Sequence, residues 1–190
     1  NEKIWAYKEF HIWRSYYPEW TKAMIKVIKK IKIKTDNKDI LEIWAGDWIN
    51  FKALKKCFGI KPNNYTIIEL DTNSIDNCKK LWIINIYNEY FNKWILDKIK
   101  NKYDIIIITE VLEHQINPKE FFETIYQLLN KNWTIIITVP NRHRFFINNR
   151  SLDWDIPPHH FLRFSKKFFI KNFWKNIIYI KDYVFKKGLE

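Results

Sequence analysis

The sequence predicts an α/β fold built on a doubly wound, mostly parallel β-sheet. Segments with strand and helix patterns alternate along the chain, which is the order that produces a parallel sheet covered by helices. The run Ile105–Ile108 is apolar on both faces, as expected for a central parallel strand. With 190 residues, 47% of them hydrophobic, the chain is long enough to bury a core of its own.

The first half of the chain alternates between helix and strand. Trp20, Met24, Ile28 and Ile31 recur at helical spacing, which predicts a helix over residues 19–33. Short apolar runs between polar segments predict the strands. The expected order is a strand at 39–43, a loop at 44–48, a helix at about 50–57, a strand at 65–70, a helix at 74–80 and a short strand at about 83–87.

The second half continues the alternation. A strand is expected at 104–109, and Pro118 stands where proline favours the first turn of a helix, here extending to about residue 129. A buried strand at 134–139 ends at Pro140, and Ser165 is expected to cap a helix reaching about residue 172. Alternating residues predict a last strand at 177–185.

No internal repeat or flexible linker divides the chain, so we expect one domain. It comprises an N-terminal helical extension at 1–37 and a main body at 38–190. The basic run at 26–34 also fits a helix on a membrane surface, although a helix packed on the core is favoured. No apolar run approaches the roughly 20 residues of a membrane span.

Charge and cysteine content narrow the function classes. The net charge of +12 is compatible with a nucleic-acid partner. It comes from 28 lysines and only 5 arginines, scattered without interleaved aromatic residues, so nucleic-acid binding is possible but not favoured. Cys57 and Cys78 lack metal-ligand spacing, which argues against a disulfide framework or a zinc site and favours the cytoplasm. We therefore expect no metal.

A loop between the first strand and its helix carries the most specific pattern. The segment Glu42-Ile43-Trp44-Ala45-Gly46-Asp47-Trp48 resembles the E/D-x-G-x-G-x-G motif of class I S-adenosylmethionine-dependent methyltransferases of the small-molecule type. The acid and the middle glycine are present, whereas tryptophan stands at the first and third glycine positions. The resemblance extends over about residues 38–180 and implies a Rossmann-like sheet.

Three further segments agree with this resemblance. Glu69 ends the second strand, where the family places an acid that binds the two ribose hydroxyls, with Asp71 as the rival. The segments 103–114 and 132–141 resemble the family's fourth strand with its loop, and its fifth strand. By resemblance, the expected cofactor-binding residues are Glu42, Trp44, Ala45, Gly46, Asp47, Trp48, Glu69, Leu70, Thr109, Glu110, Val111 and Leu112.

Tryptophan stands at several positions that favour glycine. The chain has 3 glycines, where about 13 are typical of this length, and 10 tryptophans. Trp82, Trp133 and Trp174 join Trp44 and Trp48 at turn-like positions. UGA encodes tryptophan in some genetic codes and glycine in a few bacterial lineages, so one explanation is a recoded UGA. The other is a methyltransferase-like fold that has lost its cofactor.

Histidines supply the candidate catalytic residues. His114 follows the fourth strand and is a candidate general base, or simply a residue that begins a helix. His159 and His160 lie in a long loop, where they either handle the acceptor or brace the loop.

The resemblance implies methyl transfer from S-adenosylmethionine to an unidentified small-molecule acceptor. Two alternatives stay open. One is a methyltransferase acting on RNA or protein, and the other is a non-catalytic binding module, which follows if Trp44 and Trp48 are genuine. The antiparallel strand that usually closes the family's sheet is not found, so a C-terminal truncation also stays open.

Overall fold

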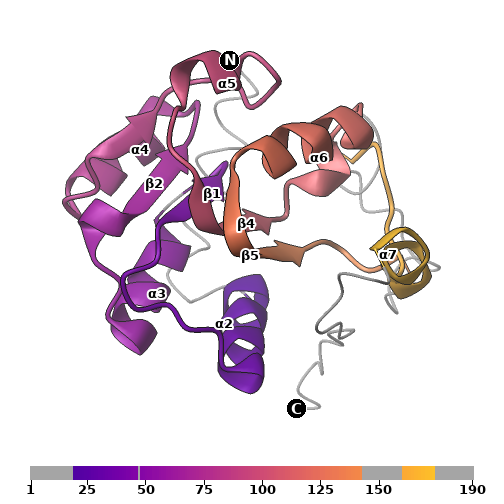
Figure 1. Cartoon of the computed structure of the whole chain (residues 1–190), viewed down its shortest axis with the longest axis horizontal. Coiled ribbons are helices and arrows are strands. Elements are labelled where there is room, and N and C mark those ends of the chain that lie inside the picture. Colours follow the sequence, from indigo (N-terminus) through magenta and orange to yellow (C-terminus); the bar gives the residue numbers. More distant parts are fainter. Residues whose placement is uncertain (1–18, 47, 143–159, 174–190) are drawn as a thin grey trace, which may run out of the picture.

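The computed structural model describes residues 19–46, 48–142 and 160–173. Its centre is a sheet of five strands in the order β3-β2-β1-β4-β5 (Figure 1). All neighbouring strands are parallel. The strands are β1 (Ile40–Ile43), β2 (Tyr65–Ile68), β3 (Asn85–Tyr87), β4 (Tyr103–Thr109) and β5 (Leu129–Thr138). The predicted doubly wound α/β fold is therefore confirmed.

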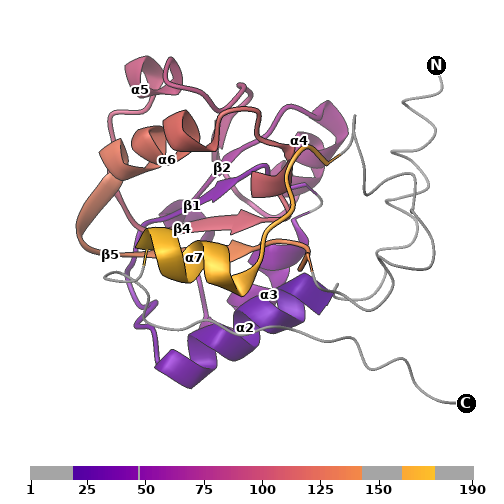
Figure 2. The same cartoon turned by 90° about the vertical axis from the view of Figure 1, so that its right-hand side faces the viewer.

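Helices cover both faces of this sheet (Figure 2). They are α2 (Glu19–Ile31), α3 (Ile49–Phe58), α4 (Thr72–Lys79), α5 (Ile95–Lys98), α6 (Pro118–Gln127) and α7 (Lys166–Phe173), with single 3₁₀ turns at Pro62–Asn64 and Leu112–His114. Side chains of α2, α3 and α4 join one hydrophobic core, and side chains of α5 and α6 join the other, against which α7 also packs. The two layers of helices are thus separated by the sheet.

Strand β4 contributes to both cores. Ile105 and Ile107 belong to the core beneath α2, α3 and α4, whereas Ile106 and Ile108 belong to the core beneath α5 and α6. All four side chains are at most 3% exposed. This alternation follows from the two-residue period of a strand and explains why the segment is apolar throughout.

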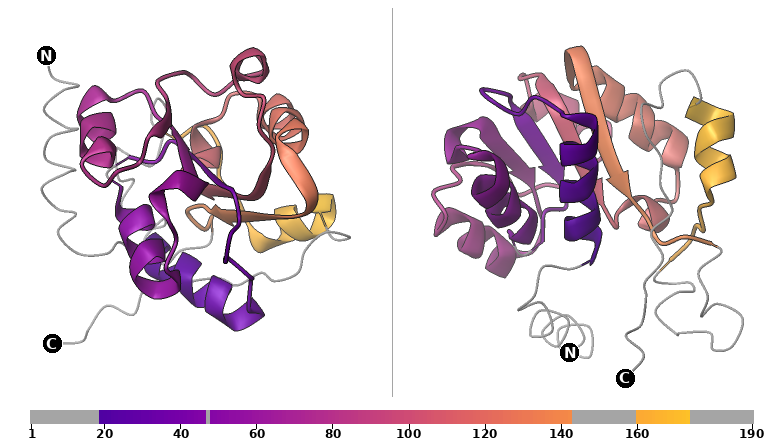
Figure 3. Two further views of the ribbon diagram at one scale, coloured as in Figure 1. Left: turned by 60° about the vertical axis from the view of Figure 1, so that its left-hand side comes forward. Right: turned by 90° about the horizontal axis from the view of Figure 1, so that it is seen from below.

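The N-terminal helix packs on the body of the protein. Met24 and Ile28 of α2 are buried in the same core as Phe51 and Leu54 of α3. The lysines of α2 lie between these apolar positions, and α2 runs beside β5 (Figure 3). Packing on the core, rather than on a membrane surface, is the arrangement found for this helix.

Local sequence features define the ends of two helices. Asn117 accepts a hydrogen bond from the Glu120 amide at 3.2 Å, and Pro118 occupies the first turn of α6. The side chain of Ser165 likewise accepts a hydrogen bond from the Phe168 amide at 3.3 Å at the start of α7. Both caps satisfy amide groups that have no partner within their own helix.

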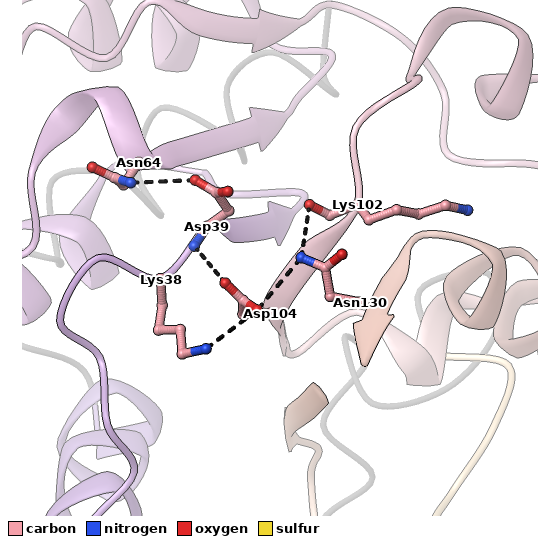
Figure 4. A network of polar contacts seen from close by, with 6 residues as sticks. All are labelled: Lys38, Asp39, Asn64, Lys102, Asp104 and Asn130. Carbon is pink, nitrogen blue, oxygen red and sulfur yellow. Dashed lines mark hydrogen bonds and ion pairs between the residues drawn. The ribbon is translucent and has the colours of Figure 1, made fainter. Parts of the chain in front are cut away.

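A polar network holds the amino-terminal edge of the sheet together (Figure 4). The Asp104 carboxylate accepts hydrogen bonds from the Asp39 amide at 3.1 Å and from the Lys38 ammonium at 3.3 Å. Asn64 donates to Asp39 at 3.2 Å, and Asn130 donates to Asp104 at 3.4 Å. These contacts join the segments before β1 and β2 to β4 and β5, at the edge opposite the loop after β1.

The predicted elements differ from the structure mainly at their ends. Strand β5 begins at Leu129, five residues earlier than expected, and α6 ends at Gln127. The short helix α5 was not expected, because four residues are too few for a helical pattern. The predicted strand at 177–185 lies outside the described residues. Within the described ranges, no helix has the length and apolarity needed to cross a bilayer.

Candidate active site

The carboxyl ends of β1, β2 and β4 meet at one edge of the sheet. Ile43 of β1 is in register with Ile68 of β2 and with Ile108 of β4. The loop after β1 and the acidic residue after β2 therefore come together. Open parallel sheets bind ligands at this edge, next to the point where the strand order reverses, which here lies between β1 and β4.

Glu69, directly after β2, contacts the loop that follows β1. Its carboxylate accepts hydrogen bonds from the amides of Gly46 at 2.7 Å, Leu70 at 2.7 Å and Asp71 at 3.0 Å. The side chain of Asp71 instead accepts a hydrogen bond from the Ser74 amide and caps α4. Of the two rival acids, Glu69 is the one in contact with the loop after β1.

Glu42 belongs to β1 and is fully buried. Its carboxylate accepts hydrogen bonds from the Asn50 amide group and the Tyr65 hydroxyl, both at 2.6 Å. Burial raises the pKa of Glu42 to about 7, although both hydrogen bonds favour the charged form. Burial and the neighbouring Glu42 also raise the pKa of Tyr65 well above its usual value. Glu42 thus joins β1 to the first turn of α3 and to β2 inside the core.

Asn50 also belongs to this region, although it was not among the residues expected from the sequence. Its amide nitrogen donates to Glu42 and, at 2.9 Å, to the Thr109 hydroxyl at the end of β4. Its amide oxygen accepts a hydrogen bond from the Thr21 hydroxyl of α2 at 2.5 Å. One side chain thereby joins α2, α3, β1 and β4. Its place in the first turn of a helix, two residues after the motif, was the only sequence sign of this role.

Trp44 and Trp48 adopt the backbone conformation that favours glycine. Their φ angles are 54° and 59°, in the left-handed region that side chains with a Cβ rarely occupy. Both indole nitrogens are buried and have no hydrogen-bond partner among the described residues. The Trp44 ring packs on Tyr90 at 5.5 Å between centroids, and the Lys52 ammonium lies 3.4 Å from the Trp48 ring centroid.

The structure gives a different result for each of the other three positions at which glycine was expected. Trp82 also has a positive φ, of 68°, and is 77% exposed after α4. In the turn before the buried part of β5, the left-handed residue is Asn132 and not Trp133, so the expected position was wrong by one residue. Trp174 lies outside the described residues.

The remaining expected cofactor residues occupy different environments. Ala45 is buried and Gly46 has a positive φ of 53°, whereas Leu70 is 48% exposed beyond β2. After β4, Glu110 has a φ of 55°. Val111 and Leu112 are buried in the core shared with α5 and α6. Asp47 lies outside the described residues.

The structure brings two of the candidate histidines together. The imidazole rings of His114 and His160 are 4.7 Å apart between centroids and nearly perpendicular. The amides of Phe161 and Leu162 both donate to the Glu113 carbonyl, at 2.9 and 3.1 Å, which fixes the segment after His160 against the β4 loop. Glu113, which was not singled out as a site residue, completes this cluster. His159 lies outside the described residues.

Comparisons with known proteins agree with this arrangement. Residues 13–176 match a family model described as a methyltransferase domain. A search of curated proteins gives no match.

Solved structures share the fold at low identity. The plantazolicin methyltransferase BamL, solved with a triazolic desmethylPZN analogue and SAH, is 21% identical, and the alignment covers 71% of this chain and 50% of BamL with a TM-score of 0.53. An S-adenosylmethionine-dependent methyltransferase from Clostridium acetobutylicum is 15% identical, with 74% and 57% coverage and a TM-score of 0.52. A further such enzyme, from Archaeoglobus fulgidus, is 16% identical, with 78% and 64% coverage and a TM-score of 0.58.

The chain therefore spans between half and just under two thirds of the length of these solved proteins. Because the family model covers most of the chain, the protein belongs to the methyltransferase domain family, and its fold is that of S-adenosylmethionine-dependent methyltransferases.

Proposed function

We propose that this protein transfers a methyl group from S-adenosylmethionine to a small-molecule acceptor. The observation that supports this most directly is the Glu69–Gly46 hydrogen bond, which joins the acid after β2 to the loop after β1 at the carboxyl edge of the sheet. A carboxylate there has two acceptor oxygens, a match for a pair of ribose hydroxyls. The solved plantazolicin methyltransferase, which is bound to SAH and a small-molecule analogue, agrees with this acceptor class.

The reaction is a direct displacement at carbon. An acceptor atom forms a bond to the methyl carbon while the carbon–sulfur bond breaks, and the positively charged sulfonium becomes a neutral thioether. The protein has to hold donor and acceptor in line, so positioning supplies most of the rate. In this proposal Glu69 and the loop around Gly46 hold the donor, and His114 and His160 contact the acceptor.

We further infer that glycine occupies positions 44, 48 and 82 in the native protein. A non-glycine residue in the left-handed region costs roughly 1–2 kcal/mol, and three tryptophans at such positions is an improbable outcome of random loss. The buried indole nitrogens of Trp44 and Trp48 add the cost of unsatisfied donors. A UGA codon that is read as glycine in the cell, but translated as tryptophan here, explains why tryptophan stands at all three positions.

Mass spectrometry of the natively produced protein tests this inference. The peptide spanning Ile40 to Lys52 is expected to contain glycine at positions 44 and 48. Tryptophan at both positions would instead favour the non-catalytic binding module, since the indoles would compete with the cofactor for space.

Binding of S-adenosylhomocysteine tests the function itself. The double variant Trp44→Gly/Trp48→Gly is expected to bind S-adenosylhomocysteine in isothermal titration calorimetry, whereas the protein with both tryptophans is not. Trp82→Gly provides the matched control, because it makes the same exchange at a left-handed residue outside the loop. If the double variant does not bind, the methyltransferase proposal fails.

The sequence also predicts a cytoplasmic protein. Cys57, which is exposed, and Cys78, which is buried, form no disulfide, as a reducing compartment allows. We therefore propose that the protein acts in the cytoplasm.

A further inference from the structure

A cluster of three potential metal ligands lies beyond the carboxyl end of β4. Glu113, His114 and His160 each offer one ligand atom, and these atoms all lie within 4.8 Å of one another. We propose that this cluster is a binding site for a divalent transition-metal ion that holds the methyl acceptor through an oxygen atom. No metal was expected from the sequence, in which His160 lies 46 residues beyond His114 and the two show no metal-ligand spacing.

The distances fit one ion. Zinc lies about 2.0–2.2 Å from imidazole nitrogen and carboxylate oxygen, so two ligands at the tetrahedral angle lie about 3.4 Å apart. The ligand atoms of the cluster lie within 4.8 Å of one another, so they would have to approach by up to roughly 1.4 Å. Rotation of the half-buried imidazoles about their side-chain bonds is sufficient for such a change.

The backbone around the cluster is held in place. His114 ends the 3₁₀ turn Leu112–His114, and its amide donates to the Val111 carbonyl at 3.1 Å. The Glu113 carbonyl accepts both amides that follow His160, at 2.9 and 3.1 Å. The two segments that supply the ligands are therefore joined at the position of the ligands themselves, which lowers the entropy lost when an ion binds.

The chemistry of the donor set selects the class of ion. Two imidazoles and one carboxylate suit zinc, manganese, iron or cobalt better than magnesium, which prefers oxygen ligands. The Glu113 side chain is only 1% exposed, and buried carboxylates are stable when they are paired or coordinate a metal. Three protein ligands leave at least one coordination position open, as in catalytic rather than structural zinc sites.

The open coordination position on the ion would bind an oxygen atom of the acceptor, and this indicates the acceptor's chemical class. A bound divalent ion lowers the pKa of a coordinated hydroxyl, as it does for water. The acceptor hydroxyl would release its proton to solvent, and its oxygen would then form the bond to the methyl carbon as the carbon–sulfur bond breaks. The acceptor is accordingly an alcohol or phenol. This catalytic step rests on the proposed methyltransferase function, whereas metal binding does not.

Metal binding is tested on the full chain without cofactor or acceptor. After treatment with a chelator, the protein is titrated with Zn²⁺ by calorimetry and with Co²⁺ by absorption spectroscopy. One ion per chain is expected, with at least about tenfold weaker binding for His114→Ala and for His160→Ala. The visible absorption of bound Co²⁺ would report its coordination number. Circular dichroism establishes that each variant is folded, and Glu113→Gln is a second probe that preserves the shape of the side chain.

Two matched controls address binding elsewhere on the protein. Cys57→Ser removes the exposed thiol, and His11→Ala removes a histidine distant in sequence. Neither is expected to change affinity or stoichiometry. The site proposal is overturned if His114→Ala and His160→Ala bind as well as the parent, or if the parent does not bind at micromolar concentrations.

The catalytic part has its own readout. With S-adenosylmethionine and a mixture of phenols and alcohols, added Zn²⁺ or Mn²⁺ should increase methyl transfer by the glycine-restored variant Trp44→Gly/Trp48→Gly. Adding His160→Ala to that variant should abolish this increase. Metal binding without stimulation would overturn the assigned role while preserving the site. Metal-independent transfer to an amine would overturn the acceptor class while preserving the methyltransferase function.

Discussion

The buried carboxylate of Glu42 makes the stability of this protein depend on pH in a direction opposite to that of most acidic side chains. Its pKa is about 7 in the folded protein, against 4.5 for an ordinary glutamate. Between these two values the folded chain keeps a proton that the unfolded chain has released. Stability therefore falls as the pH rises from about 4.5 to about 7, and the loss is complete above that window.

The magnitude follows from the same two pKa values. A difference of about 2.5 between 7 and 4.5, at 1.36 kcal/mol for each pKa unit, corresponds to roughly 3 kcal/mol over the whole window. Applied between pH 5 and pH 8, the linkage relation gives about 2.5 kcal/mol. The variant Glu42→Gln cannot ionise, so it should lack this component at both pH values.

Urea denaturation of the parent and of Glu42→Gln at pH 5 and pH 8 measures the effect. From pH 5 to pH 8 the parent is expected to lose about 2.5 kcal/mol more unfolding free energy than the variant. Any local cost of the amide against Asn50 and Tyr65 is present at both pH values and cancels. Glu123→Gln, which changes an exposed carboxylate on α6, is the matched control. A difference below about 0.5 kcal/mol, or one of opposite sign, would refute the assignment of a buried, partly protonated Glu42.

Three further substitutions test other parts of the structure. Asn50→Ala removes hydrogen bonds to Glu42, Thr109 and Thr21, so we expect a loss of about 2–4 kcal/mol in unfolding free energy, measured by urea denaturation; Asn73→Ala, on the exposed side of α4, should change it little. Trp82→Gly should raise the unfolding free energy by about 1 kcal/mol, because Trp82 is 77% exposed with a φ of 68°. Trp94→Gly, at an exposed tryptophan with a φ of −70°, should not, and equal effects of the two in thermal denaturation would argue against backbone strain at Trp82. Glu69→Gln in the glycine-restored protein should weaken S-adenosylhomocysteine binding by at least about tenfold in calorimetry, whereas Asp71→Asn should preserve binding and only destabilise α4; the reverse result would make Asp71 the ribose acid.

Much of the fold could be predicted because its determinants are local. The run Ile105–Ile108 identified the central strand, because burial on both faces requires apolar residues throughout. Pro118 identified the start of α6, because proline favours the first turn of a helix. The short helix α5 and the early start of β5 could not be predicted in this way. They depend on packing against α6 and on pairing with β4, which no short stretch of sequence records.

The site was predictable where backbone conformation dictates residue type. Glycine-favouring turns were expected at positions 44, 48 and 82, and all three residues have positive φ. Asn50 and Glu113 were not predicted as site residues, because their neighbours in the site lie far along the chain. These neighbours are Thr109 for Asn50 and His160 for Glu113. Which residues far apart in the sequence become neighbours depends on how the chain folds back to the sheet. A single sequence does not show this.

The two-sided burial of β4 has a consequence for how the protein opens. Since alternate isoleucines of this strand belong to different cores, neither layer of helices can separate from the sheet without exposing part of the same strand. We expect the two layers to unfold as one cooperative unit, and the β4 amides to be among the last to exchange their hydrogens with deuterated water. Hydrogen exchange at Ile105–Ile108 would then report the global free energy of unfolding, and exchange at the frayed ends of the helices only local openings.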